Sequence, residues 1–166
     1  MFNSIEQFEQ FYQQESGMTQ KVMNQLTDES LTQPVSEGHR TLGRIAWHIV
    51  NTIPEMMSNT GLKFNSDPNA PVPSKAEDIK KAYAQASQEL LNNVKAEWND
   101  QTLQQEDDMY GEKWKKGLTL MILQQHEIHH RGQMTVLMRQ ANLVVPSIYG
   151  PAKEGWAEFG MQPPEI

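Results

Sequence analysis

Apolar side chains recur every three to four residues in four stretches of the chain, the spacing that places them on one face of an α-helix. Glycine, proline or strongly polar segments separate these stretches, and none shows the sustained alternation of a β-strand. Ser4 with Gln7, and Ser74 with Glu77, have the spacing of a capping box at a helix start. The predicted helices cover residues 4–26, 41–58, 74–99 and 114–142.

The connections between these helices predict how the helices are arranged. The segment 27–40 contains Pro34 and Gly38, and residues 60–73 are rich in glycine and proline, so both should be loops. Residues 100–113 are polar and acidic. Four amphipathic helices with two long connections predict an all-α fold, a four-helix bundle with crossover connections, formed as a single domain over residues 1–166.

Two local features qualify this picture. Pro54 lies inside the second predicted helix, where the missing N–H and the ring should bend or weaken the preceding turn. Residues 153–159 are expected to form a short helical turn that packs Trp156 and Phe159 back on the bundle.

Composition and charge exclude several classes of function. The chain has no cysteine, so disulfides, thiolate metal sites and cysteine nucleophiles are absent. A net charge of −7 repels phosphate backbones and argues against nucleic-acid binding. The N-terminus lacks the basic and apolar regions of a secretory signal, and no run approaches the roughly 18 apolar residues of a membrane span. We therefore expect a cytoplasmic protein with no membrane partner.

Histidine spacing indicates a metal site. His126 and His130 are four residues apart on the fourth predicted helix, so both point the same way, toward the apolar face. Neutral imidazole nitrogens are good ligands for zinc, and bundle cores often hold metals between facing helices. The alternative is that the pair is simply hydrogen-bonded within the core.

His48, in the middle of the second predicted helix, is the natural third ligand. Three histidines from two helices leave coordination positions open, which is the pattern of catalytic sites rather than structural ones. The three imidazoles suit one divalent zinc, nickel, copper or iron ion. His129 should face another helix edge or solvent, and His39 is expected at the surface of a loop.

The letters from His126 to His130 also spell the H-E-x-x-H signature of zinc metallopeptidases. In that alternative Glu127 is the general base, and Glu154 or Glu158 supplies the third ligand. Gln133 occupies the position of the glycine in the extended metzincin motif, and no sheet is readable in the sequence before the helix. We therefore expect Glu127 to be a charge on the helix surface instead.

Two motifs resemble those of the DinB-like family of bacterial metal-binding proteins. Residues 38–49 (GHRTLGRIAWHI) resemble the family's second-helix motif, and residues 126–133 (HEIHHRGQ) its fourth-helix motif. The resemblance implies a four-helix bundle with a three-histidine site for zinc or nickel, the ligands being His48, His126 and His130, and a homodimer. It extends more distantly to transferases in which a metal activates a small-molecule thiol for attack on an electrophilic substrate.

Two function classes remain open besides the peptidase. One is a metal-dependent thiol S-transferase or hydrolase, for which Trp47 and Tyr110 could line the approach and Glu55 could serve as general base. The other is a non-catalytic, stress-associated metal-binding protein.

Three further residues lie within the fourth-helix motif. Gly132 should allow close approach of a neighbouring helix. Arg131 and Gln133 either orient the ligands or make surface or interhelical hydrogen bonds.

Overall fold

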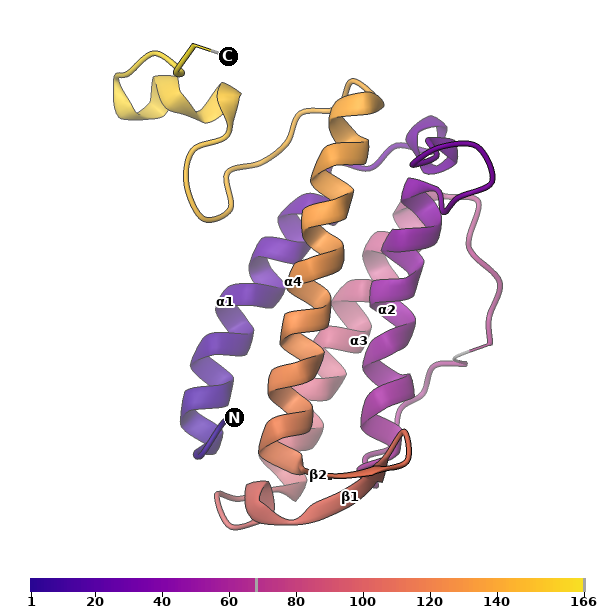
Figure 1. The fold of residues 1–166 in the computed structure, drawn as a ribbon, viewed down its shortest axis with the longest axis vertical. Coiled ribbons are helices and arrows are strands. Elements are labelled where there is room, and N and C mark those ends of the chain that lie inside the picture. The colour runs from indigo at the N-terminus through magenta and orange to yellow at the C-terminus, as the bar shows by residue number, and fades with distance from the viewer. Residues whose placement is uncertain (68, 166) are drawn as a thin grey trace.

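The computed structural model describes residues 1–67 and 69–165, so Pro68, in the loop predicted over residues 60–73, lies outside the described part. Within those residues the main elements are α1 (Ile5–Met23), α2 (Leu42–Ser58), α3 (Ala76–Glu97) and α4 (Lys116–Gln140). Figure 1 shows α1 and α4 running in one direction, and α2 and α3 in the other. The all-α four-helix bundle expected from the sequence is confirmed.

The direction of the helices follows from a long connection. The segment between α2 and α3 climbs along the outside of the bundle and returns the chain to the end at which α2 began (Figure 1). As a result α2 lies parallel to α3 and antiparallel to α4, and it packs against both. This crossover places the middle of α2 against the middle of α4.

The helix starts show one confirmed cap and one correction. The Ser4 hydroxyl accepts a hydrogen bond from the Gln7 amide at the start of α1, as predicted. The predicted Ser74–Glu77 box does not form, because α3 begins after Lys75, which makes no side-chain cap. Instead Asp28, from the loop after α1, accepts a hydrogen bond of 2.8 Å from the Ala76 amide. A tertiary contact thus supplies the missing acceptor.

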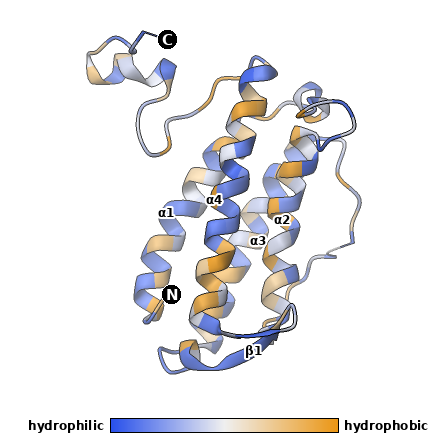
Figure 2. Ribbon diagram, in the orientation of Figure 1, coloured by the Kyte–Doolittle hydropathy of each residue, from blue (hydrophilic) through white to orange (hydrophobic). Residues whose placement is uncertain are grey.

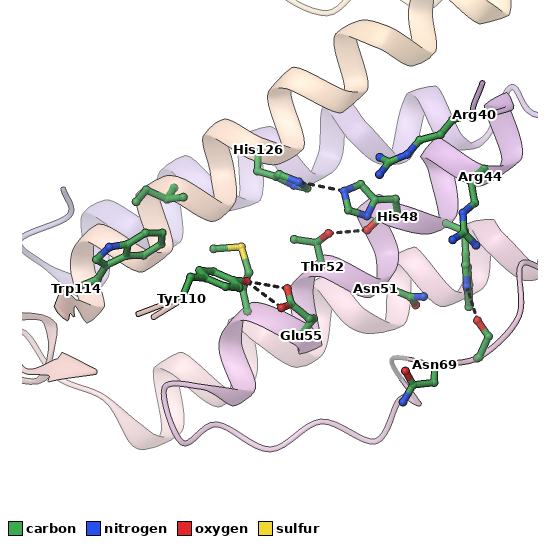
Figure 3. Close-up of a pocket in the computed structure, with 14 residues that line it drawn as sticks. Arg40, Arg44, His48, Asn51, Thr52, Glu55, Asn69, Tyr110, Trp114 and His126 are labelled. Atoms are coloured by element: carbon green, nitrogen blue, oxygen red, sulfur yellow. Dashed lines mark hydrogen bonds between the residues drawn. The ribbon is translucent and has the colours of Figure 1, made fainter. Parts of the chain in front are cut away.

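A small β-hairpin corrects the expectation that the chain has no strands. Strands β1 (Glu106–Met109) and β2 (Glu112–Lys115) pair in antiparallel register, joined at Tyr110 and Gly111, which both have positive φ (54° and 88°). Strands of four residues are too short to give a readable alternation. The hairpin lies at the base of the bundle and carries Tyr110 toward α2 (Figures 1 and 3).

The apolar stripes of the helices meet in one core, and Figure 2 shows hydrophobic and hydrophilic positions interleaved along every helix. Short 3-10 helices, η1 (Glu29–Thr32) and η2 (Thr102–Gln104), lie in the connections. A third, η3 (Lys153–Phe159), matches the predicted helical turn but stands away from the bundle (Figure 1). Phe159 is 61% exposed, so the expectation that it packs on the bundle is wrong.

No helix among the described residues is both long and apolar enough to cross a membrane.

Candidate metal centre

The structure brings His48, His126 and His130 together between α2 and α4. His48 lies mid-way along α2, and the other two lie one turn apart on the facing side of α4. The Nε2 atom of His126 is 3.1 Å from the Nε2 atoms of both His48 and His130. One ligand atom from each of the three rings lies within 4.8 Å of the others.

This spacing suits a single metal ion. Two nitrogens bound at about 2.0–2.1 Å with a tetrahedral angle between them lie about 3.3 Å apart. Because Nδ1 of the neutral His130 ring donates to Gln133, its Nε2 atom, 3.1 Å from Nε2 of His126, carries the lone pair that a metal ion would bind. The donor set therefore can hold a divalent ion.

A hydrogen bond behind the rings fixes one of the three imidazoles. The Nδ1–H of His130 donates to the carboxamide oxygen of Gln133 at 2.7 Å, which leaves Nε2 free to bind a metal. The Gln133 amide nitrogen lies 3.0 Å from Nε2 of His129, so His129 supports the site indirectly. His126 Nδ1 is buried without a partner among the described residues. Of the two roles considered for Gln133, its hydrogen bond to the His130 ring is compatible with the orienting one.

Electrostatics keep the three rings neutral. Burial, followed by the neighbouring histidines, lowers the pKa of His48 from its ordinary 6.5 to about 4. Burial is also the main cause that lowers the pKa of His126 to about 4, and it lowers the pKa of His130. The positive charge of Arg40 lowers the pKa of all three histidines further. Neutral imidazole is the form that binds metals.

A cavity of about 720 Å³ opens beside the histidines, and both His48 and His126 line it. Trp47 and Tyr110, expected from the sequence to flank the approach, line it as well, and the indole N–H of Trp47 donates to the Ala70 carbonyl at 3.0 Å. Figure 3 shows the two imidazoles facing each other across the cavity wall. A ligand in this cavity could reach an ion held by the histidines.

Glu55 lies on the same wall, about two turns beyond His48 along α2. Both of its carboxylate oxygens accept from the Tyr110 hydroxyl, at 3.0 and 2.9 Å. Burial, then the hydrogen bond to Glu55, raises the pKa of the Tyr110 phenol. The hairpin thus places the Tyr110 hydroxyl, a proton donor, beside the carboxylate of Glu55 from α2 at one end of the cavity (Figure 3).

Glu127 does not lie on the helix surface as expected, since it is only 2% exposed. Its Oε1 accepts hydrogen bonds of 2.6 Å from Thr19 on α1 and from Tyr83 on α3, while Oε2 has no partner among the described residues. Burial raises its pKa. The carboxylate is held toward α1 and α3, whereas the cavity lies between α2 and the hairpin, so the H-E-x-x-H interpretation loses its general base.

The other residues of that interpretation also lie elsewhere. Glu154 is in η3 and forms an ion pair with Arg139, while Glu158 is exposed on the same short helix. Arg131 is buried and makes an interhelical ion pair of 2.6 Å with Glu15 on α1. No atom of another helix lies within 4 Å of a Cβ built on Gly132, so the expected close helix approach at this position is wrong.

Two cavity residues were missed by the sequence reasoning, although they lie within the second-helix motif. Arg40 and Arg44 line the cavity on the side of His48 opposite Glu55 (Figure 3). Arg44 could have been found from the sequence, because it is four residues before His48 and therefore shares its helix face, whereas Arg40 precedes the helix and carries no such signal.

Comparison with known proteins agrees with this architecture. The uncharacterized protein YrdA of Bacillus subtilis (strain 168) is 48% identical over 167 residues, covering all of both chains. A crystal structure of a DinB-like protein from Bacillus cereus ATCC 10987 is 45% identical, covers 90% of this chain and 100% of its own, and has a TM-score of 0.87. A DinB-like protein of Bacillus subtilis, YjoA, shares the fold at 18% identity and a TM-score of 0.64, over 82% of this chain and 92% of its own. The DinB family model matches residues 1–165, and the chain therefore belongs to the DinB family.

Proposed function

We propose that the protein binds one divalent metal ion through the Nε2 atoms of His48, His126 and His130, and that it uses this ion in a reaction on a small molecule, as a thiol S-transferase or a hydrolase. The observation that carries the proposal is the convergence of three neutral imidazoles beside a cavity of about 720 Å³. Three protein ligands leave open coordination positions, and a cavity beside them gives a ligand access.

Zinc or nickel is the proposed ion, since three imidazoles suit either and the resemblance described above points to both. A divalent ion in such a site deprotonates a bound thiol or lowers the pKa of bound water to about 7. The chain's own residues supply the rest. Gln133 orients the ring of His130, and Trp47 anchors the loop at the cavity edge.

Glu55 and Tyr110 are the proposed proton-handling pair. They face the cavity and already share a proton donor and an acceptor across 2.9–3.0 Å. Because Glu55 is seven residues after His48, it lies about 10 Å farther along the axis of α2. It would therefore act on a part of the substrate away from the ion rather than as a ligand.

Elemental analysis of the purified protein tests the proposal. We expect about one zinc or nickel ion per chain in the wild type, and loss of the ion in both His48→Ala and His130→Ala with helical circular dichroism retained. His39→Ala is the matched control, because it removes an exposed loop histidine outside the cavity and should keep the ion.

Metal removal provides a second readout. An ion that binds α2 and α4 together stabilises only the folded chain, so a chelator should lower the thermal midpoint of the wild type but not that of His48→Ala. A wild type that contains no transition metal and takes none up on titration would refute the proposed function.

A further inference from the structure

Two arginines on the cavity wall lack a counter-ion. Arg40 and Arg44 both line the cavity, and neither guanidinium forms an ion pair or a side-chain hydrogen bond with any residue in the described ranges 1–67 and 69–165. The chain as a whole carries a net charge of −7, so a pair of unneutralised cations at one site departs from the general charge of the molecule. Guanidinium groups bind carboxylate and phosphate oxygens with two parallel hydrogen bonds.

The arginines occupy one end of the cavity. Arg44 is one helical turn before His48, about 6 Å along the axis of α2, and Arg40 lies just before the N-cap residue Thr41. Glu55 and Tyr110 lie on the other side of the histidines (Figure 3). The cavity is therefore positive at one end, has the histidines in the middle, and carries a carboxylate at the other end.

This layout selects the charge and the orientation of a ligand. An anionic group placed beside Glu55 would be repelled, whereas the same group beside the two arginines, which are exposed to solvent, would be attracted. A metal ion held by the histidines would add further positive charge in the middle of the cavity, next to the arginine end. The cavity thus favours a molecule with a metal-binding head and an oxyanion tail.

We propose that Arg40 and Arg44 form an oxyanion subsite that binds a carboxylate or phosphate of the substrate, while another group of that substrate reaches the ion at His48, His126 and His130. The second half of this statement rests on the proposed function, but the arginine subsite itself does not require the metal. The substrate class is a small acidic molecule, and the two arginines are specificity-determining residues rather than ligands of the ion.

Calorimetric titration with defined probes tests the subsite. Mercaptosuccinate carries a thiol and two carboxylates, 2-mercaptoethyl phosphate carries a thiol and a phosphate, and 1-thioglycerol is a neutral thiol of similar size. Each probe is titrated into the metal-loaded and the metal-free protein, as wild type and as Arg40→Gln/Arg44→Gln. The matched control, Lys21→Gln/Lys81→Gln, removes two charges from exposed helix positions outside the cavity.

We expect the arginine substitutions to weaken binding of at least one acidic probe by about tenfold or more. Binding of 1-thioglycerol, the metal content and the control variant should remain unchanged. The acidic probe that loses more affinity identifies the oxyanion. Equal affinities of wild type and Arg40→Gln/Arg44→Gln for both acidic probes would overturn the subsite, as would an equal loss in the lysine control.

The two proposals can fail separately. A wild type without metal that still loses affinity for an acidic probe on arginine substitution refutes the metal centre and supports the subsite. A protein that holds its metal but binds acidic and neutral thiols alike, with or without the arginines, refutes the subsite alone.

Discussion

At the residue scale, Glu127 shows how neighbouring helices determine what a side chain does. It is adjacent in sequence to His126, yet its carboxylate lies among α1 and α3 and accepts from the Thr19 and Tyr83 hydroxyls. A buried carboxylate with two donors is a structural acceptor, because removing it would break a 2.6 Å hydrogen bond to each hydroxyl and leave Tyr83 only its longer contact of 3.4 Å with the Ser16 carbonyl. It serves to join three helices.

Substitution of Glu127 should therefore affect stability and not metal binding. We expect Glu127→Ala to lower the free energy of unfolding by about 2–4 kcal/mol, since two buried hydroxyls lose their shortest hydrogen bonds and the core loses a buried side chain. Urea denaturation measures the loss, and elemental analysis should still find the ion. Glu127→Gln, which keeps an acceptor oxygen, should cost less. Loss of the ion in Glu127→Gln with the fold intact would contradict this role.

The lowered pKa values of the histidines make the stability of the metal-free protein depend on pH. The pKa values of His48 and His126 are lowered from 6.5 to about 4 in the folded chain, so between these values the unfolded chain binds more protons. The free energy of unfolding of the metal-free protein should fall as the pH drops from 6.5 toward 4 and change little above 6.5 through these groups. Proton NMR titration of the imidazole C2 protons gives the midpoints, and midpoints at or above 6.5 would contradict the burial effect.

At the element scale, two glycines of α4 have opposite surroundings. A Cβ on Gly132 would meet no atom within 4 Å, whereas a Cβ on Gly117 would lie 2.3 Å from the carbonyl oxygen of Phe2. Glycine costs a helix interior about 1 kcal/mol relative to alanine because its backbone is freer in the unfolded chain. Replacement of the glycine by alanine can remove this cost only at Gly132, where the added methyl group has room.

We expect Gly132→Ala to raise the free energy of unfolding by about 0.5–1 kcal/mol. Gly117→Ala, on the same helix, should lower it because the N-terminal segment must move to admit the methyl group. Thermal and urea denaturation of the two variants give the comparison. A destabilised Gly132→Ala would show that some partner approaches α4 at this position.

At the scale of the whole molecule, the C-terminal part is tied to the bundle mainly by polar contacts, which include the Arg139–Glu154 ion pair and the hydrogen bonds of the Tyr149 hydroxyl to Glu15 and Arg131. The helix η3 stands away from the four helices, and Phe159 and Met161 are exposed (61% and 50%), as is Val136 on α4 (60%). Association of two chains would remove such apolar surface from water. The homodimer implied by the family resemblance would give these groups a partner.

We expect light scattering on the eluted protein to give twice the chain mass of 19.0 kDa. Phe159→Ser/Met161→Ser should shift the chain toward the monomer while the metal content stays the same, because the histidines lie between α2 and α4 of one chain. A wild type that remains a monomer at high concentration would refute the dimer.

The local pattern of the sequence was sufficient to predict the four helices and to place His126 and His130 on one helix face. Apolar spacing located all four helices to within a few residues, because each helix buries one stripe and the period of that stripe is local. The four-residue spacing of His126 and His130 likewise required them to share a face whatever surrounded them.

Tertiary structure decided everything that depends on two segments meeting. The cap of α3 comes from Asp28, the acceptor role of Glu127 comes from α1 and α3, and the partner of Glu55 comes from a hairpin too short to read in the sequence. The charge layout of the cavity has the same origin. Arg40 and Arg44 are exposed residues that line the cavity only because the crossover places α2 beside α4. The charge layout of a cavity depends on surfaces brought together in space, so the sequence alone does not give it.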